Sequence, residues 1–403
     1  MSTSWKTAFI GTLIHLFLGT VYAWSFFQVP IMELTGWNNT QTTMAFSLAI
    51  LTLGITASWA GQRLNVYSPQ KLTIIGGFLF GLGYILASFA LKLNLLWFFY
   101  LGFGIISGCG LGLAYVTPVA VVSRWFSKHQ GLATGLVVMG FGLGAFMMSK
   151  ILAPLFFRLT GQDVALSFRY SGFIFLVVVP LLGFFLKFPP KLSVNNSLSE
   201  IKLGEISNIK TILIWLVFTL NIIVGMIFLS FQSPLFQELM QKKMITDSHE
   251  LMNAGATLIA VSAFFNGIGR FLWASLSDRV GRITAFQMLI ALEIICFILL
   301  IFTQNITLFF ILVCVILLCY GGGFGILPSL VKDEFGVEKM PKMYGRILTG
   351  WGVGGLIGTL TTAFLKDTFN ENAGVYVFST GLVVSVFALI LSILLVKKSG
   401  LKK

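Results

Sequence analysis

Apolar stretches of about 20 residues alternate with short polar segments along the whole chain. An α-helix needs about 20 apolar residues to cross the ~30 Å hydrocarbon core of a bilayer. This pattern predicts an all-α integral membrane protein with twelve transmembrane helices. We place these helices at 7–32, 42–62, 71–91, 95–122, 131–157, 168–187, 211–237, 254–276, 283–303, 307–331, 344–365 and 374–396.

The polar segment 188–210 separates two sets of six predicted helices. It opens with two prolines, continues as SVNNSLSE, and is too long for a tight turn. We therefore expect a first six-helix bundle at 1–187, a cytoplasmic linker at 188–210 and a second six-helix bundle at 211–403. Glycine pairs recur at an offset of 213 residues, at Gly110 and Gly112 and again at Gly323 and Gly325. Such a repeat predicts two related, pseudo-symmetric bundles, as in many transporters.

Composition agrees with a membrane protein, because 57% of the 403 residues are hydrophobic and only 10% are charged. Soluble domains carry about 25% charged residues. The net charge of +13 does not indicate nucleic-acid binding, since the basic residues lie in short clusters between apolar runs. With the N-terminus inside, 19 of the 27 Lys and Arg residues fall in cytoplasmic segments. We expect a multi-pass protein of the cell membrane, in bacteria the inner membrane, with both termini cytoplasmic.

The segment NGIGRFLWASLSDRVGR, residues 266–282, places an arginine inside an apolar run. An arginine at the centre of a membrane helix costs ~2.5–3.5 kcal/mol on insertion scales, so it tends to face a cavity or a partner. Arg270 precedes the charged turn at Asp278 by about 12 Å of helix, which puts it near the midplane. Asn266 lies one turn earlier on the same face. The alternative is an arginine that snorkels to the interface.

The charged turn resembles the G-x-x-x-D-R-x-G-R motif of the major facilitator superfamily, which occurs between helices 2 and 3 and between helices 8 and 9. The second copy keeps four positions, and the first copy keeps Gly61 but has Asn65 in place of the acid. The resemblance implies the major facilitator fold and assigns a conformational gating role to six residues: Gly61, Asn65, Asp278, Arg279, Gly281 and Arg282. We expect Asn65 to weaken the first copy.

Within that superfamily, the chain resembles the oxalate/formate antiporter family. The matching stretches include TVYAWSFF at 20–27, RWFSKHQGLATGL at 124–136 and YGRILTGWGVGGLIG at 344–358. The resemblance implies that Arg270 binds the carboxylate of the substrate. It also places Trp351 where the oxalate transporter has a lysine, which favours a smaller or singly charged acid.

Other polar and aromatic residues within the spans are candidates for the substrate site, with helix packing as the alternative for each. They are Tyr22, Trp24, Tyr115, Gln232, Asn266 and Tyr320. His15 and Glu293 are candidates for proton coupling, since ionisable groups at membrane depth are often functional. For Glu293 the alternative is a protonated or paired structural acid. The glycine rows, which include Gly142 and Gly352, are interpreted as close-packing surfaces.

The sequence therefore predicts a secondary transporter, working as a monomer, that moves a small carboxylate anion by alternating access. Anion antiport and proton-coupled symport both fit this prediction. We expect no metal and no cofactor, and the partners are the substrate anion and the lipid bilayer. A membrane-embedded enzyme would need paired acids or a nucleophile at cavity depth, and only Glu293 is acidic within the predicted spans. A transporter-like sensor and a carrier of a non-carboxylate solute are the remaining alternatives.

Overall fold

The computed structural model describes residues 3–64, 66–126, 130–189 and 209–399, and these residues form helices and connecting turns without strands. Twelve helices within this part are long and apolar enough to cross a membrane, as predicted. The first six spans comprise α1 (Thr3–Leu18), η1 (Gly19–Ala23) and α2 (Trp24–Thr35); α3 (Asn39–Arg63); α4 (Pro69–Lys92); α5 (Leu96–Phe99), η2 (Tyr100–Ser107) and α6 (Gly108–Trp125); α7 (Gln130–Met147), η3 (Met148–Leu152) and α8 (Ala153–Thr160); and α9 (Val164–Phe184).

The last six spans begin at α11 (Ile209–Gln241), α12 (Ser248–Val280) and α13 (Arg282–Phe302), and continue through α14 (Ile306–Ile347), α15 (Thr349–Phe369) and α16 (Ala373–Ser399), with η4 (Asn370–Asn372) before the last. Helix α14 holds one span and the start of the next, because Gly336 breaks it with a φ of 79°. Glycine adopts this left-handed conformation without a steric penalty. The two spans are therefore Ile306–Gly336 and Lys342–Phe369.

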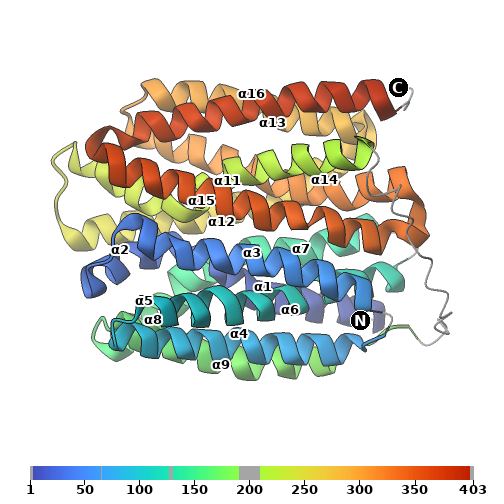
Figure 1. Ribbon diagram of the computed structural model, residues 1–403, viewed down its shortest axis with the longest axis horizontal. Coiled ribbons are helices and arrows are strands. Elements are labelled where there is room, and N and C mark those ends of the chain that lie inside the picture. Colours follow the sequence, from blue (N-terminus) through green and yellow to red (C-terminus); the bar gives the residue numbers. More distant parts are fainter. Residues whose placement is uncertain (1–2, 65, 127–129, 190–208, 400–403) are drawn as a thin grey trace.

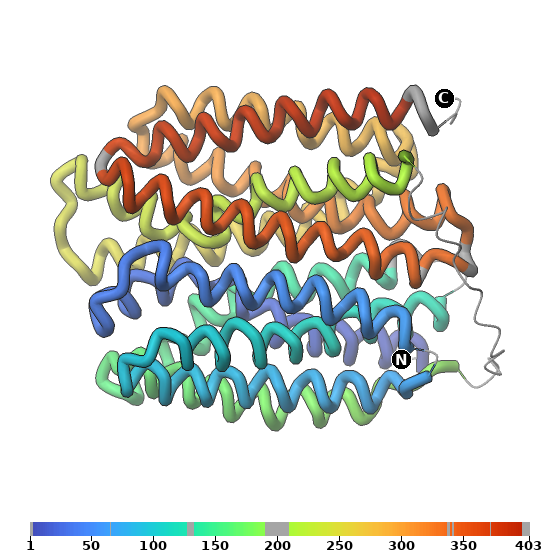
Figure 2. The backbone as a smooth tube through the Cα atoms, viewed as in Figure 1, coloured from blue at the N-terminus to red at the C-terminus, as the bar shows by residue number. Residues whose placement is uncertain are grey.

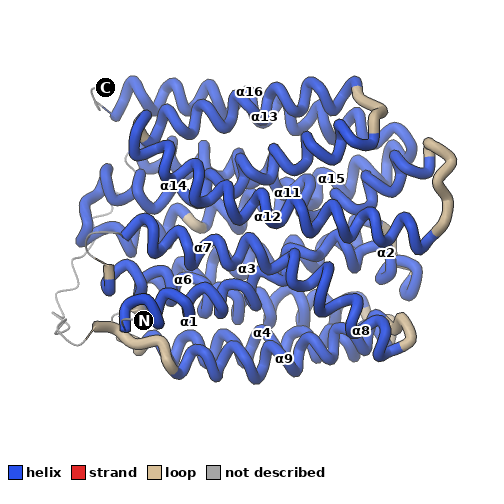
Figure 3. The backbone as a smooth tube through the Cα atoms, turned by 180° about the vertical axis from the view of Figure 1, so that it is seen from behind, coloured by secondary structure: helices blue, strands red, loops and turns tan. Residues whose placement is uncertain are grey.

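The spans lie side by side and roughly antiparallel, with the elements up to α9 on one side and those from α11 onward on the other (Figures 1 and 2). We call these two groups the first half and the second half. Helix α1 begins and helix α16 ends at the same end of the molecule, which we call the termini end (Figure 1). We call the opposite end the far end; it holds the turns before α3 and α12 (Figure 3).

Helix irregularities interrupt three spans of the first half. The first span changes to a 3₁₀ turn over Gly19–Ala23, and the fourth and fifth spans contain π-helical segments at Tyr100–Ser107 and Met148–Leu152. Each change of hydrogen-bonding pattern rotates the residues that follow relative to those that precede it. The 3₁₀ turn contains Tyr22, one of the predicted site residues.

The two halves meet through glycines at two places. An added Cβ on Gly54 of α3 would lie 2.8 Å from the backbone of Gly352 in α15, and one on Gly142 of α7 would lie 2.7 Å from Gly267 in α12. Real Cβ atoms essentially never come this close to a neighbour, so the helices can approach to this distance only because glycine stands there. The prediction that Gly142 and Gly352 belong to close-packing surfaces is confirmed.

Candidate functional site

Arg270 lies in α12 at the boundary between the two halves, and its side chain is fully buried. Its Nε donates a hydrogen bond of 3.4 Å to Oδ1 of Asn266, one turn earlier. Its Nη1 and Nη2 have no hydrogen-bond partner among the described residues. A buried guanidinium with two unused terminal nitrogens can bind a planar anion through both of them.

Aromatic rings from both halves surround the guanidinium. Its central carbon lies 4.7 Å from the ring centre of Phe324 in α14 and 5.7 Å from that of Phe141 in α7. The indole of Trp351 in α15 packs between these two rings, at 4.8 Å and 5.6 Å from their centres. The ring faces favour a cation electrostatically, which offsets part of the cost of burying Arg270.

A pair of hydroxyl groups joins the two halves next to this cluster. Tyr22 of η1 and Tyr320 of α14 lie with their hydroxyl oxygens 2.6 Å apart, and the two residues belong to different halves. Tyr22 also contacts Phe141 and Trp351, at ring-centre distances of 4.9 Å and 6.3 Å. The pair thus belongs to the same cluster as Arg270.

Tyr115 of α6 and His15 of α1 complete the first-half wall of the site. Their ring centres lie 4.9 Å apart, and Tyr115 also lies 4.9 Å from Trp351. Nδ1 of His15 donates to the backbone carbonyl of Gly11 at 3.1 Å. The hydroxyl of Tyr115 and Nε2 of His15 have no partner among the described residues.

Several buried donors in this cluster make no hydrogen bond of ordinary geometry within the described residues, although the hydroxyl of Tyr115 lies near both Arg270 and Tyr344. Besides Nη1 and Nη2 of Arg270, they are Nδ2 of Asn266, Nε1 of Trp351 and the hydroxyls of Tyr115 and Tyr344. Buried polar groups are normally paired, so a concentration of unpaired ones calls for an explanation. All of them can donate a hydrogen bond, and an anion is the ligand that accepts from several donors at once.

Two of the predicted substrate residues lie away from Arg270. Trp24 packs within the first half, stacked on Phe46 at 5.6 Å and 5.1 Å from Phe103. Gln232 of α11 accepts a hydrogen bond of 2.7 Å from Ser262 of α12, within the second half. The described contacts of both residues are structural, so the geometry brings together only Tyr22, Tyr115, Asn266, Tyr320 and Trp351 with Arg270.

Glu293 of α13 lies inside the second half and is fully buried. Its Oε1 accepts a hydrogen bond of 2.9 Å from Nδ2 of Asn221 in α11. Its Oε2 has no partner among the described residues. Glu293 shares none of these contacts with Arg270. Its role in proton coupling stays a prediction, and so does that of His15.

Comparison with known proteins decides the family. The model of the Major Facilitator Superfamily matches residues 8–359 and 244–403 of this chain. The chain belongs to the Major Facilitator Superfamily. The oxalate:formate antiporter of Oxalobacter formigenes is 23% identical over 377 residues, which cover 88% of this chain and 85% of that protein. The apicoplast pyruvate carrier 1 of Toxoplasma gondii is 24% identical over 478 residues, covering 93% of this chain and 85% of that protein.

A solved structure shares the fold of this superfamily member. The bacterial homologue of the human lysosomal transporter Spinster, in an inward-facing and occupied conformation, superposes with a TM-score of 0.68 at 16% identity, covering 97% of this chain and 96% of that one. The resemblance read from the sequence is therefore confirmed, and so is the twelve-helix major facilitator fold. The protein is a multi-pass membrane transporter of this superfamily.

The charged turn of the superfamily lies at the termini end, between α12 and α13. Arg282 pairs with Asp278 at 2.5 Å and with Asp333 of α14 at 3.1 Å, and it donates to Ser277 at 2.6 Å. Gly281 has a φ of 93°, which lets the chain turn between the two helices. Arg279 is exposed, Gly61 lies on α3, and Asn65 lies outside the described residues. The gating role of these residues stays a prediction.

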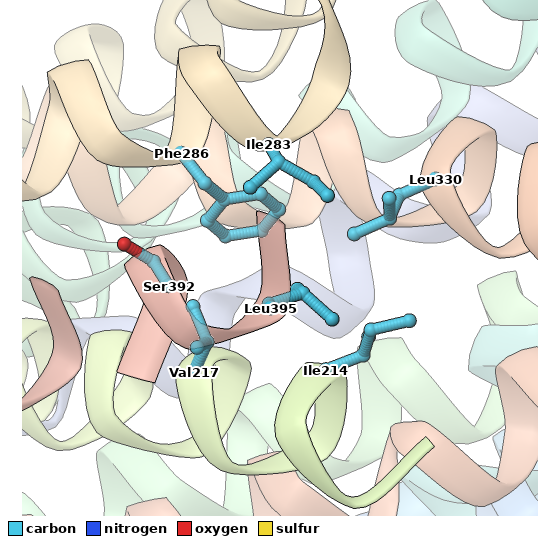
Figure 4. Close-up of a pocket in the computed structure, with 7 residues that line it drawn as sticks. All are labelled: Ile214, Val217, Ile283, Phe286, Leu330, Ser392 and Leu395. Carbon is cyan, nitrogen blue, oxygen red and sulfur yellow. The ribbon is translucent and has the colours of Figure 1, made fainter. Parts of the chain in front are cut away.

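A separate apolar pocket lies in the second half, near the termini end. Residues of α11, α13, α14 and α16 line it, and Ser392 is its one polar side chain (Figure 4). The full lining is Ile214, Val217, Ile283, Phe286, Leu330, Ser392 and Leu395. None of the predicted site residues belongs to it, so the pocket is not the candidate substrate site.

Three residues of the site were not predicted from the sequence. Phe141 and Phe324 are apolar residues in apolar runs, and their only local signal is that glycines flank them in GFG. Tyr344 had a clearer signal, because it lies seven residues before Trp351 and positions i and i+7 share a helix face. The side chains of Tyr344 and Trp351 are both buried, and Tyr344 lies close to Tyr115.

Proposed function

We propose that this protein carries a small carboxylate anion, with one carboxylate group, across the membrane by alternating access. One observation carries the proposal: Arg270 is fully buried, makes no ion pair within the described residues, and leaves Nη1 and Nη2 unused. The relatives support the same substrate class, because one is named an oxalate:formate antiporter and another a pyruvate carrier.

In this proposal the charged, hydroxyl-bearing and aromatic residues of the site contact different parts of the substrate. Arg270 pairs with both carboxylate oxygens through its planar fork. Tyr115 and Tyr344 donate further hydrogen bonds to the anion. Trp351 and Phe324 cover the rest of a small substrate with apolar surface. Their rings also reduce the space for a second carboxylate, which favours formate, lactate or pyruvate over oxalate.

We propose anion exchange as the transport mode, on grounds of charge balance. The described ion pairs include no acid that compensates Arg270. Closing both ends around an unpaired guanidinium is costly, whereas a bound carboxylate neutralises it. The carrier with a bound anion should therefore change between its inward-facing and outward-facing conformations more easily than the empty carrier. Proton-coupled symport is the second candidate, because His15 contacts Tyr115 within the site.

The proposed setting is a bacterial inner membrane with both termini in the cytoplasm, and a single chain suffices for the cycle. The termini end would then be the cytoplasmic end. Since the site holds donors and aromatic rings, we infer that the protein moves its substrate without converting it.

Counterflow in proteoliposomes tests this proposal. Vesicles loaded with unlabelled formate, lactate, pyruvate or oxalate receive the same labelled acid outside. An exchanger accumulates label only when the vesicle is preloaded, whereas a proton symporter accumulates it in unloaded vesicles under an inward proton gradient. No uptake of any of these acids in either condition would overturn the carboxylate assignment.

Arg270 variants provide the control. Arg270→Gln should reduce counterflow to the level of empty vesicles while the amount of inserted protein stays normal, because removing a buried charge relieves an insertion cost. Arg270→Lys keeps the charge and loses the fork, so its apparent affinity should fall about tenfold or more. Wild-type counterflow by Arg270→Gln would show that the arginine does not bind the substrate.

A further inference from the structure

The far end of the molecule holds a cluster of hydrogen bonds between the two halves. Asp367 lies in the last turn of α15, in the second half, and both of its carboxylate oxygens accept from the first residues of α3, in the first half. Oδ1 accepts from the backbone N–H of Asn39 at 3.1 Å and from its Nδ2 at 2.9 Å. Oδ2 accepts from the backbone N–H of Thr40 at 2.8 Å and from its hydroxyl at 2.6 Å.

This contact uses the strongest electrostatic feature of a helix end. The first N–H groups of α3 have no partner within the helix, and the helix dipole favours a negative charge there. Asn38 already caps α3 by accepting from the N–H of Gln41, so Asp367 satisfies the two N–H groups that Asn38 leaves. Gln28 of α2 donates to Oδ1 of Asn39 at 3.3 Å and holds that side chain in position.

The neighbouring charged pair is different in kind. Lys366 pairs with Glu238 of α11, and both residues belong to the second half. Asp367, one residue later, is bound only across the boundary in the described contacts. Deeper on the same two helices, the hydroxyls of Ser47 and Thr359 also hydrogen-bond across the boundary. The far end of α15 is therefore fixed to α3 by polar contacts that a separation of the halves would break.

We propose that Asp367 is a latch that holds the far end closed and releases α3 whenever the far end opens. The latch requires the alternating access of a major facilitator transporter and does not depend on which solute is carried. In the open state Asp367 and the first turn of α3 are both hydrated, so water replaces the four hydrogen bonds. The latch thus biases the closed-to-open equilibrium without touching the substrate site.

Asp367→Asn is the decisive variant. It preserves the size of the side chain but turns one acceptor oxygen into an NH₂ donor, which faces donors on Asn39 or Thr40. At least two of the four hydrogen bonds are then lost, and the equilibrium should shift toward the open far end by about tenfold or more. Glu238→Gln is the matched control, because it removes a carboxylate at the same end that pairs within one half.

Distance measurements between spin labels report this shift directly. In purified protein whose four native cysteines are replaced by alanine, one label pair spans the far end at Leu34→Cys and Met244→Cys, both exposed positions. A second pair spans the termini end at Val66→Cys and Val280→Cys, also exposed. Asp367→Asn should add a longer far-end distance and a shorter termini-end distance, whereas Glu238→Gln should leave both distributions unchanged.

A second variant keeps the test decisive if Asp367→Asn fails to fold. Thr40→Val removes one of the four hydrogen bonds and leaves the carboxylate in place, so it should shift the same distances in the same direction by a smaller amount. Unchanged far-end distances in the folded variants would overturn the latch. An equal shift in Glu238→Gln would overturn it too, because the effect would then be one of charge at this end. Neither result bears on carboxylate transport, which the counterflow assay tests separately.

Discussion

The hydroxyl groups of Tyr22 and Tyr320 lie 2.6 Å apart although 298 positions separate them in the chain. Both side chains are fully buried, and each comes from a different half of the transporter. The hydrogen bond therefore joins the two halves within the aromatic cluster that surrounds Arg270. It is a contact that must break if the halves separate toward the far end.

Removing both hydroxyls of this pair should destabilise the protein by less than the two single removals added together. Tyr22→Phe leaves the hydroxyl of Tyr320 buried without its partner, which costs about 1–3 kcal/mol. In Tyr22→Phe combined with Tyr320→Phe, no unpaired hydroxyl remains, so the loss should be smaller than the sum of the single losses. Thermal unfolding of the purified variants measures this coupling, and additive losses would show that the two hydroxyls do not interact.

Tyr344 should contribute to substrate affinity through its hydroxyl alone. Its side chain is buried and its hydroxyl is unpaired within the described residues. Tyr344→Phe keeps the ring, so the protein should insert and unfold like wild type. The half-saturating substrate concentration should rise about ten- to a hundredfold, because one hydrogen bond to a charged group is worth ~1.5–3 kcal/mol. Concentration-dependent counterflow gives this value, and Thr73→Val serves as a control for a buried, unpaired hydroxyl away from the site. An unchanged value would place Tyr344 outside the binding surface.

Trp351 should set the preference for singly charged acids. Its indole contacts both Phe141 and Phe324 beside Arg270 and leaves no second cation there, so wild type should bind oxalate weakly. Trp351→Lys introduces a second cation beside Arg270, and it should raise the ratio of oxalate to formate affinity about tenfold or more. Competition of both acids in the counterflow assay tests this, with Trp351→Met as an uncharged control of similar flexibility to lysine. Tight oxalate binding by wild type would contradict the prediction.

Glu293 should matter for stability rather than for exchange. Glu293→Gln keeps an acceptor for Asn221, so we expect normal insertion and normal counterflow. Asn221→Leu leaves a carboxyl group buried without its donor and should lower the free energy of unfolding by about 1–3 kcal/mol. Melting curves and counterflow of both variants decide the matter. If Glu293→Gln instead abolishes uptake driven by a proton gradient, Glu293 carries protons.

The fold could be predicted from the sequence because the bilayer imposes one length on every span. Twelve apolar runs gave twelve helices, and most boundaries differ by only a few residues. The 3₁₀ turn at Gly19–Ala23 and the π-helical segments could not be predicted in this way. Hydropathy reports which side chains are apolar. It carries no information on whether a backbone N–H bonds to the carbonyl three, four or five residues earlier, which is what distinguishes these helix types.

Members of the candidate site could be predicted where a polar group stands out within an apolar run, as Arg270 and Asn266 do. They could not be predicted where only the direction of an apolar side chain matters. Tyr22 and Trp24 illustrate the difference, because residues two positions apart point to different sides of a helix. Tyr22 contacts Trp351 of the second half, whereas Trp24 stacks on Phe46 within the first half. The polar residues of the first span are not gathered on one side of the helix, so no clear periodic pattern marks which side faces the other half.

The glycine contacts between the halves are suited to serve as a pivot for a rocking motion of one half against the other. Gly54 meets Gly352 and Gly142 meets Gly267 on spans where no side chain stands between the backbones. Arg270 follows Gly267 by one turn of α12, so the pivot at Gly267 lies at nearly the same depth in the membrane as the arginine. When the two halves rotate about this pivot, the ends of the spans move far and the residues at the pivot move little. On the proposed function, a bound anion would therefore stay in place while the barrier to water passes from one side of it to the other.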